Sequence, residues 1–318
     1  MTPMKARTLF CLSAVALCGL AWLVSCSPPD VRMGMAPADS IKLSYRIVGK
    51  GKPLVVIHDG PGYEKSMLYK GFDDLSSQMR VIYYDQRGCG RSEPIAPTVS
   101  LSVEDNVRDL EDLRRYLRLR KMSLAAHGWG AVIALEYARA YPKHVESIIL
   151  IAPMSPFAPD PEFENVIEKL PPESRERIAV ALEDPTASMV ERRETIMREI
   201  LPSLFFRKEA AEEIKFDMVK LAPDVNLRLG PDIKTLDLFT VLGEVTQPAL
   251  VIVGRHDISS PLRDQIAYAD GMKQADAVVF NGSGHFPFLE ENSFFLNLVR
   301  VFLRDRSVPT LASAVRIP

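Results

Sequence analysis

Short, uninterrupted apolar runs separated by helical patterns constrain the fold of this chain more than any other feature. The runs cover residues 54–57, 81–84, 123–126, 148–151, 249–253 and 277–280. Runs of this length without polar alternation are typical of strands that are buried on both faces of a parallel sheet. Helical patterns lie between them, so the order strand, helix, strand predicts a mostly parallel sheet covered on both faces. A half-buried strand is also expected at residues 41–47, where apolar and polar side chains alternate.

The region from 153 to 245 breaks this alternation. It is rich in Glu and Arg, contains several helical patterns and shows no convincing strand. We therefore expect a helical cap at 153–245, inserted between a first core segment at 41–152 and a second at 246–305. A tail would follow at 306–318.

The N-terminus has the layout of a secretory signal. Lys5 and Arg7 precede an apolar stretch over 9–24, and Cys26 follows directly after Ser25. This end resembles the lipobox of bacterial lipoproteins, which implies a signal peptide at 1–25, acylation of Cys26 and a tether at 26–40. Because Ser27 follows the cysteine, the resemblance implies the periplasmic side of the outer membrane if the cell is Gram-negative. The alternative is an uncleaved membrane-spanning helix.

Charge and cysteine content limit the possible partners. A net charge of -2 provides no basic surface to attract nucleic acid, so no nucleic-acid partner is expected. Of the four cysteines, Cys11 and Cys18 lie in the signal and Cys26 is the predicted lipid site, which leaves Cys89 without a disulfide partner. No metal or cofactor is expected.

Four groups of segments that follow strands carry the chemistry of the chain. They are His58-Asp59-Gly60-Pro61-Gly62; Asp85-Gln86-Arg87-Gly88-Cys89-Gly90-Arg91-Ser92; Ala126-His127-Gly128-Trp129-Gly130; and the pair Gly254-Arg255-His256-Asp257 and Gly282-Ser283-Gly284-His285. In this order they resemble the proline iminopeptidase branch of the α/β-hydrolases, with its H-G-G-P-G, D-Q-R-G-x-G-R-S and G-x-S-x-G motifs. The resemblance spans about 41–304 and implies an α/β-hydrolase fold.

The resemblance also implies a role for each position. Asp257 corresponds to the carboxylate that orients the base, and His285 to the general base. The backbone N–H groups of Gly60 and Trp129 correspond to the oxyanion hole, with His58 and Asp59 in the same pocket.

The chain departs from the family at the nucleophile. The third residue of the elbow motif is Gly128, which has no side chain to attack a substrate. Losing the nucleophile of a triad lowers turnover by about 10⁶-fold. Glycine also tolerates the strained turn of the elbow, so Gly128 should relax it.

Two further departures concern the pocket. Asp59 stands where the family has glycine; its carboxylate either faces the pocket, where it would disfavour an oxyanion, or points to solvent from a turn. The family's cap carries a W-x-x-W-E segment, whereas the tryptophans of this chain are Trp22 and Trp129. Acidic cap residues such as Glu209, Glu212 and Glu213 could meet an amine, but we expect them to form a solvated helix face.

No other residue is expected to replace the nucleophile. Cys89 lies at a position that packs in the family, and Ser92 matches a structural serine of the motif. Ser259 and Ser260 follow Asp257 in a loop, where a hydroxyl would cap the next helix.

Three hypotheses for function follow from this frame. The first is a pseudo-hydrolase whose pocket binds a small peptide-like or hydrophobic ligand at the cell envelope. The second is an enzyme that acts without a serine, through a base formed by His285 and Asp257. The third is an envelope interaction protein that presents a surface to a partner.

Overall fold

One eight-stranded sheet forms the centre of the protein in the part of the chain that the structure describes. This computed structural model describes residues 30–99, 101–156, 166–212, 214 and 219–308. The strands are β1 (Val31–Ala38), β2 (Ile41–Val48), β3 (Lys52–Ile57), β4 (Met79–Tyr84), β5 (Met122–His127), β6 (Val145–Ile151), β7 (Ala249–Gly254) and β8 (Ala275–Phe280). Their order in the sheet is β1-β2-β4-β3-β5-β6-β7-β8. The strands β4, β3, β5, β6, β7 and β8 run parallel to one another, whereas β2 pairs antiparallel with both β1 and β4.

Each predicted apolar run lies in one of the parallel strands. Successive side chains of β3 enter opposite layers: Val55 and Ile57 belong to one hydrophobic cluster, and Leu54 and Val56 to the other. A sheet buried on both sides explains why these strands show no polar alternation. The predicted fold class is confirmed.

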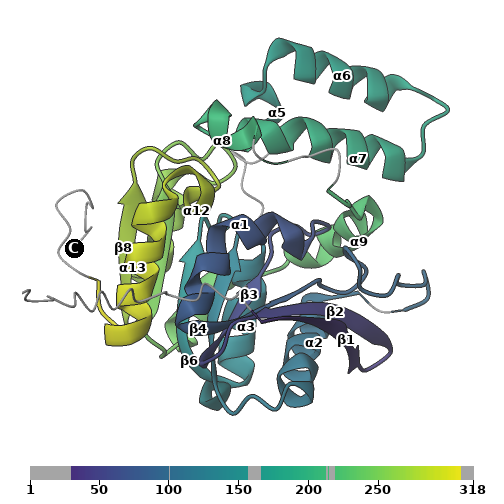
Figure 1. The fold of residues 1–318 in the computed structure, drawn as a ribbon. Coiled ribbons are helices and arrows are strands. Elements are labelled where there is room, and N and C mark those ends of the chain that lie inside the picture. Colours follow the sequence, from purple (N-terminus) through teal and green to yellow (C-terminus); the bar gives the residue numbers. More distant parts are fainter. Residues whose placement is uncertain (1–29, 100, 157–165, 213, 215–218, 309–318) are drawn as a thin grey trace, which may run out of the picture.

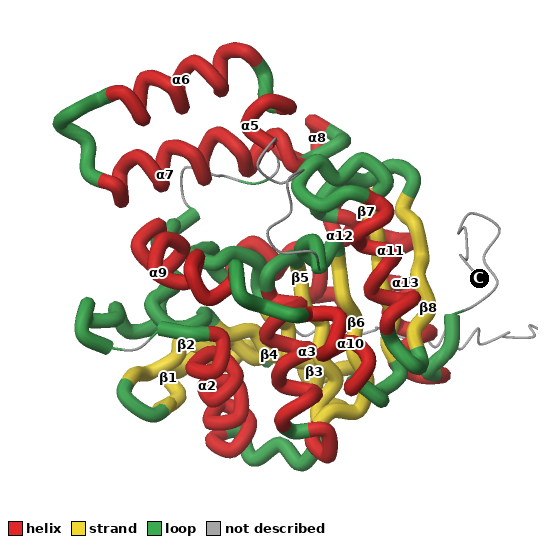
Figure 2. The backbone as a smooth tube through the Cα atoms, turned by 180° about the vertical axis from the view of Figure 1, so that it is seen from behind, coloured by secondary structure: helices red, strands yellow, loops and turns green. Residues whose placement is uncertain are grey.

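Helices cover both faces of the sheet (Figures 1 and 2). On one face, α2 (Val103–Tyr116), α3 (Gly130–Ala140), α10 (Leu238–Glu244) and α11 (Leu262–Gly271) contribute to the first cluster. On the other, α1 (Tyr69–Phe72), α12 (Pro287–Glu290) and α13 (Asn292–Asp305) contribute to the second, next to the short 3₁₀ helices η1 (Lys65–Leu68) and η2 (Asp73–Ser77). A third 3₁₀ helix, η3 (Pro142–His144), leads into β6.

The predicted tether at 26–40 is wrong for its second half. Residues 31–38 form β1, which pairs with β2 along its whole length. Ala36 and Ala38 are buried in the core, whereas Met33 is 63% exposed. An edge strand tolerates a proline such as Pro37 and needs few apolar side chains, so it leaves a weak signal in the sequence.

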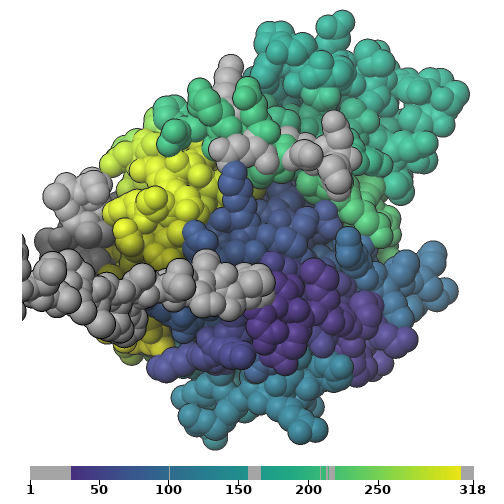
Figure 3. Space-filling view, viewed as in Figure 1, coloured from purple at the N-terminus to yellow at the C-terminus, as the bar shows by residue number. Residues whose placement is uncertain are grey.

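The described residues between β6 and β7 form helices and no strand. They are α5 (Val166–Lys169), α6 (Pro172–Glu183), α7 (Met189–Ile200), η4 (Leu201–Leu204), α8 (Lys208–Glu212), α9 (Pro223–Ile233) and α10. The paired helices α6 and α7 stand away from the sheet as a separate lobe (Figures 1 and 3). α10 lies in the range predicted for the cap, but it packs against α3 and α11 because Leu238, Val241 and Leu242 are buried there. The predicted signal at 1–25, Cys26 and the last ten residues lie outside the described residues. Within those residues, we find no helix with the length and apolar character needed to cross a bilayer.

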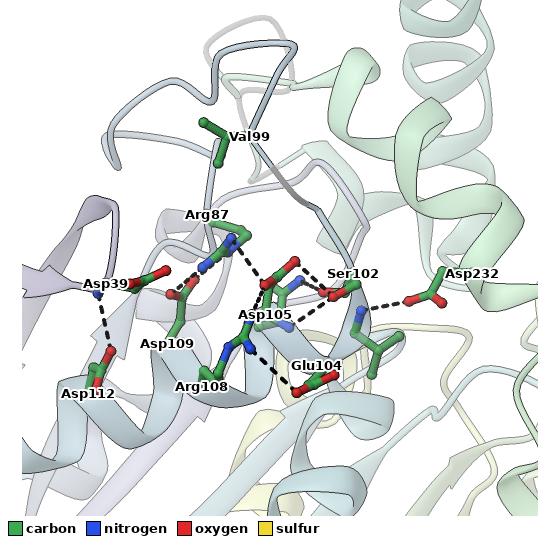
Figure 4. A network of polar contacts seen from close by, with 12 residues as sticks. Asp39, Arg87, Val99, Ser102, Glu104, Asp105, Arg108, Asp109, Asp112 and Asp232 are labelled. Atoms are coloured by element: carbon green, nitrogen blue, oxygen red, sulfur yellow. Dashed lines mark hydrogen bonds and ion pairs between the residues drawn. The ribbon is translucent and has the colours of Figure 1, made fainter.

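A buried ion pair ties the loop after β4 to α2 (Figure 4). Arg87 donates from Nε and Nη2 to the two carboxylate oxygens of Asp109, each at 2.7 Å. Both side chains are buried. The N-cap of the same helix is Ser102, whose hydroxyl oxygen accepts a hydrogen bond from the N–H of Asp105. These contacts fix the position of the motif that follows β4.

Removing the charge of Asp109 should destabilise the protein. We expect Asp109→Asn to lower the free energy of unfolding by about 3 kcal/mol, because buried Arg87 would lose its bidentate partner and keep only Asp105, at 3.9 Å, as a counter-charge. Urea unfolding followed by circular dichroism measures this. The matched control is Asp305→Asn, in the exposed pair with Arg304, which should change stability by less than about 0.5 kcal/mol. Equal effects of the two substitutions on the free energy of unfolding would contradict a stabilising role for the buried pair of Arg87 and Asp109.

Candidate active site

The carboxyl ends of four parallel strands bring the predicted site residues together. Asp59 follows β3, Gly128 follows β5, Asp257 follows β7 and His285 follows β8. Parallel strands end at the same edge of a sheet, which is where ligands bind in open α/β folds. These four residues therefore lie close together in the fold although they are far apart in the chain.

Asp257 and His285 form a hydrogen-bonded pair. His285 Nδ1 lies 2.7 Å from Asp257 Oδ2. Asp257 is itself held in place, because its Oδ1 accepts from the backbone N–H and the hydroxyl of Ser259 at 2.8 and 2.6 Å. This arrangement leaves Nε2 of His285 facing the elbow after β5.

Gly128 adopts a left-handed conformation, with φ of +52°. A residue with a side chain is strained in this region, so glycine relaxes the turn. Space is a second reason for glycine here. A Cβ atom at residue 128 would lie 1.9 Å from Oδ1 of Asp59, far inside van der Waals contact.

The Asp59 carboxylate occupies the space that a nucleophile's side chain would need. Its Oδ1 accepts a 2.7 Å hydrogen bond from the backbone N–H of Trp129, the predicted oxyanion donor. Its Oδ2 lies 3.0 Å from Nε2 of His285. Asp59 is buried, so of the two alternatives from the sequence the pocket-facing one is correct and the solvent-facing one is wrong.

The charges of this cluster stabilise one another. Burial alone would lower the pKa of His285, but the carboxylates of Asp257 and Asp59 outweigh it and raise the pKa to about 10. Burial opposes ionisation of Asp59 as well, yet His285 and the N–H of Trp129 lower its pKa to about 2. At neutral pH the pair is therefore an imidazolium next to a carboxylate.

His58 supports the loop that carries Asp59. Its Nδ1 donates to the backbone oxygen of Asp59 at 2.6 Å, and its Nε2 accepts from the N–H of Gln86 at 3.0 Å. Trp129 donates from its indole to the side chain of Gln86 at 2.9 Å. Gly60, with φ of +153°, lies in the same loop near the Trp129 ring. His58 thus holds the backbone of the site in place.

His127 is a site residue that our sequence analysis did not single out. Its ring centroid lies 4.5 Å from that of His285, and its Nε2 lies 2.7 Å from the backbone oxygen of His285. Burial and the charge of His285 lower the pKa of His127 to about 4, so it is neutral. The sequence did contain a signal for His127, because it is a polar residue at the end of a buried strand and directly precedes Gly128.

The other candidate nucleophiles are not aimed at the base nitrogen. Cys89 is fully buried, and burial raises the pKa of its thiol, so it packs as expected. The Ser92 hydroxyl donates to the backbone oxygen of Asp85 and has the structural role expected for it. Ser259 does not act as a simple helix cap; its hydroxyl lies 3.0 Å from Nδ1 of His285, on the side of Asp257. The hydroxyl of Ser260 is buried without a hydrogen-bond partner among the described residues.

The clash between residue 128 and Asp59 should appear as energetic coupling. We expect Gly128→Ser alone to lower the free energy of unfolding by about 2 kcal/mol, because the new side chain overlaps the carboxylate and the left-handed backbone is strained. Asp59→Gly vacates that space, so the double variant should be more stable than the sum of the single effects by about 1 kcal/mol or more. Urea unfolding of the four proteins of this cycle measures the coupling. Additive effects would contradict the steric argument.

Comparisons with known proteins agree with this architecture. A family model described as "alpha/beta hydrolase fold" matches residues 52–195. A proline iminopeptidase of Heyndrickxia coagulans is 29% identical over 270 residues, covering 81% of this chain and 92% of that protein. A second proline iminopeptidase, from Saccharolobus solfataricus, is 26% identical and covers 81% and 87% of the two chains.

Solved structures show the same fold. A thermophilic esterase from Thermogutta terrifontis superposes with a TM-score of 0.69 at 27% identity, covering 86% of this chain and 99% of the esterase. An esterase from Exiguobacterium antarcticum gives a TM-score of 0.70 at 19% identity, over 86% of this chain and 100% of that one. This chain therefore has the α/β-hydrolase fold and is related to the proline iminopeptidases.

Proposed function

We propose that this protein is a lipid-anchored pseudo-hydrolase of the cell envelope. It lacks serine acyl transfer, and its capped site binds a small peptide-like or hydrophobic ligand. One observation carries the loss of serine chemistry: the Asp59 carboxylate lies where a nucleophile's side chain and an oxyanion would have to be.

Two features of Asp59 oppose acyl transfer. A tetrahedral intermediate needs a free donor for its oxyanion, but the N–H of Trp129 already donates to Asp59. The fixed negative charge would also repel a developing oxyanion by Coulomb's law in a poorly hydrated site. The absence of a nucleophile and the absence of a free oxyanion donor therefore both support the proposal that the protein lacks serine acyl transfer.

Contacts between the cap and the site loops support binding of a small ligand. The N–H of Ala222 donates to the backbone oxygen of Gly62, and the side chain of Asn226 donates to that of Pro61. The N–H of His285 donates to the backbone oxygen of Leu204 in η4. Apolar side chains such as Met197 are buried against these loops. A cap that contacts the site loops in this way would shield a small apolar or peptide-like ligand from water.

One observation favours the second hypothesis, an enzyme without serine. The pair of Asp257 and His285 has the 2.7 Å geometry of a base and its orienting carboxylate. However, Nε2 of His285 is bonded to Asp59, so the base would first have to leave this ion pair. The third hypothesis, an interaction protein, is supported by exposed apolar residues on α6 and α7, among them Val180 and Met189.

The natural protein should not react with a fluorophosphonate probe. We expect no labelling of the natural protein and detectable labelling of the double variant Asp59→Gly/Gly128→Ser, because that variant regains a serine, a free oxyanion donor and a free imidazole. The measurement is in-gel fluorescence after reaction, together with hydrolysis of p-nitrophenyl esters and prolyl anilides. Adding His285→Ala to the double variant is the control and should abolish labelling.

Two outcomes would contradict the pseudo-hydrolase. Strong labelling of the natural protein would show a serine nucleophile that we have not identified. Turnover by the natural protein that His285→Ala abolishes would favour the enzyme without serine.

Acylation of Cys26 should decide where the protein resides. We expect Cys26→Ser to move the protein from the detergent phase to the aqueous phase in a detergent partition of cells, because the acyl chains supply the membrane affinity. Cys89→Ser is the matched control and should leave the partition unchanged. Retention of the Cys26 variant in membranes with an uncleaved N-terminus would instead indicate a spanning helix.

A further inference from the structure

Three side chains at the elbow converge on one small volume. Asp59, His127 and His285 each direct one donor atom into it, and these atoms lie within 4.8 Å of one another. We propose that these residues form a binding site for a divalent transition-metal ion, with Zn²⁺ as the first candidate. This goes beyond the proposed ligand binding and beyond our sequence-based expectation that the protein has no metal.

The donor set suits such an ion. Two imidazole nitrogens and one carboxylate oxygen are ligands that Zn²⁺ accepts, and three protein ligands with one open position are typical of zinc sites that also bind water or a substrate. Two histidines and one carboxylate also bind Fe²⁺, so iron is the second candidate.

Each candidate ligand has a partner that orients it. Nδ1 of His285 donates to Asp257, which directs the lone pair of Nε2 into the cluster once this imidazole is neutral. Nε2 of His127 lies 2.7 Å from the backbone oxygen of His285, an atom that only accepts, so Nε2 carries the hydrogen and Nδ1 carries the lone pair. Oδ1 of Asp59 is fixed by the N–H of Trp129, which leaves Oδ2 as the ligand atom. Metal-binding histidines almost always donate their other ring N–H to a carboxylate or a backbone carbonyl, as both do here.

The charge of the cluster also favours a cation. Asp59 and Asp257 place two buried negative charges on either side of one imidazole. In the described part of the chain, His285 is the one cationic side chain that contacts these carboxylates. A divalent ion bound to neutral His285 would balance both charges, and the imidazolium proton would pass to solvent.

Small movements would bring the donors to bonding distance. With bonds of about 2.0–2.1 Å, ligand atoms in a tetrahedral zinc site lie about 3.3 Å apart. Oδ2 of Asp59 and Nε2 of His285 are already 3.0 Å apart, so the ion would separate them slightly while His127 approaches. Gly128 makes this possible, because any side chain there would overlap the Asp59 carboxylate.

Cobalt provides a direct test. The full chain, purified in detergent and stripped with a chelator, is titrated with Co²⁺, and visible absorption reports four- or five-coordinate binding. We expect one equivalent to bind, Zn²⁺ to displace it, and Zn²⁺ to raise the unfolding temperature. Asp59→Asn and His127→Gln should each weaken Co²⁺ binding at least tenfold. His144→Gln, a histidine outside the site, is the matched control and should bind as the natural protein does.

The proposal fails if the natural protein shows no stoichiometric Co²⁺ spectrum. It also fails if His127→Gln and Asp59→Asn, each with native circular dichroism, bind Co²⁺ as tightly as the His144 control, since the ion would then bind elsewhere. These outcomes are independent of the fluorophosphonate experiment, which reports on serine chemistry alone.

Discussion

The hydrogen bonds of the Asp59 carboxylate determine what the rest of the site can do. One oxygen takes the N–H of Trp129 and the other meets Nε2 of His285. In a serine hydrolase these two groups serve the oxyanion and the nucleophile, at separate points of the reaction. Here a single side chain occupies both, in a buried position where charge interactions are strong. The site is therefore stable as a closed ion-pair cluster, and the fold around it is otherwise that of a hydrolase.

Gly128 and Asp59 are best understood as one structural change. A Cβ at residue 128 and the carboxylate of Asp59 cannot coexist, because they would lie 1.9 Å apart. Glycine at residue 128 thus leaves room for the Asp59 carboxylate, which gives His285 a second counter-charge. Because each of these buried charges then has a partner, the two residues support one stable arrangement of the site.

Much of the fold could be predicted because it depends on patterns that are local in sequence. The runs at 54–57 and 249–253 are apolar on both faces, and glycine-rich segments follow them at strand ends. β1 escaped prediction because an edge strand is exposed along most of its length and needs few apolar residues. The order of the motifs in the sequence was enough to predict that Asp257 would lie next to His285. The direction of the Asp59 side chain did not follow from sequence, since an aspartate in a turn can face either way.

His127 shows most clearly why the site could not be completed from sequence. At the end of a buried strand, a histidine can be a packed core residue, a hydrogen-bond donor or a metal ligand, and the pattern of neighbours is the same in each case. What distinguishes these roles is the atom opposite each ring nitrogen. Only the fold reveals that Nε2 faces the backbone oxygen of His285, 158 residues later in the chain. That contact leaves the other nitrogen with a lone pair, and a donor atom of His127 lies within 4.8 Å of those of Asp59 and His285. A residue that looked like part of the elbow motif thereby joins a cluster in which hydrogen bonds orient each donor.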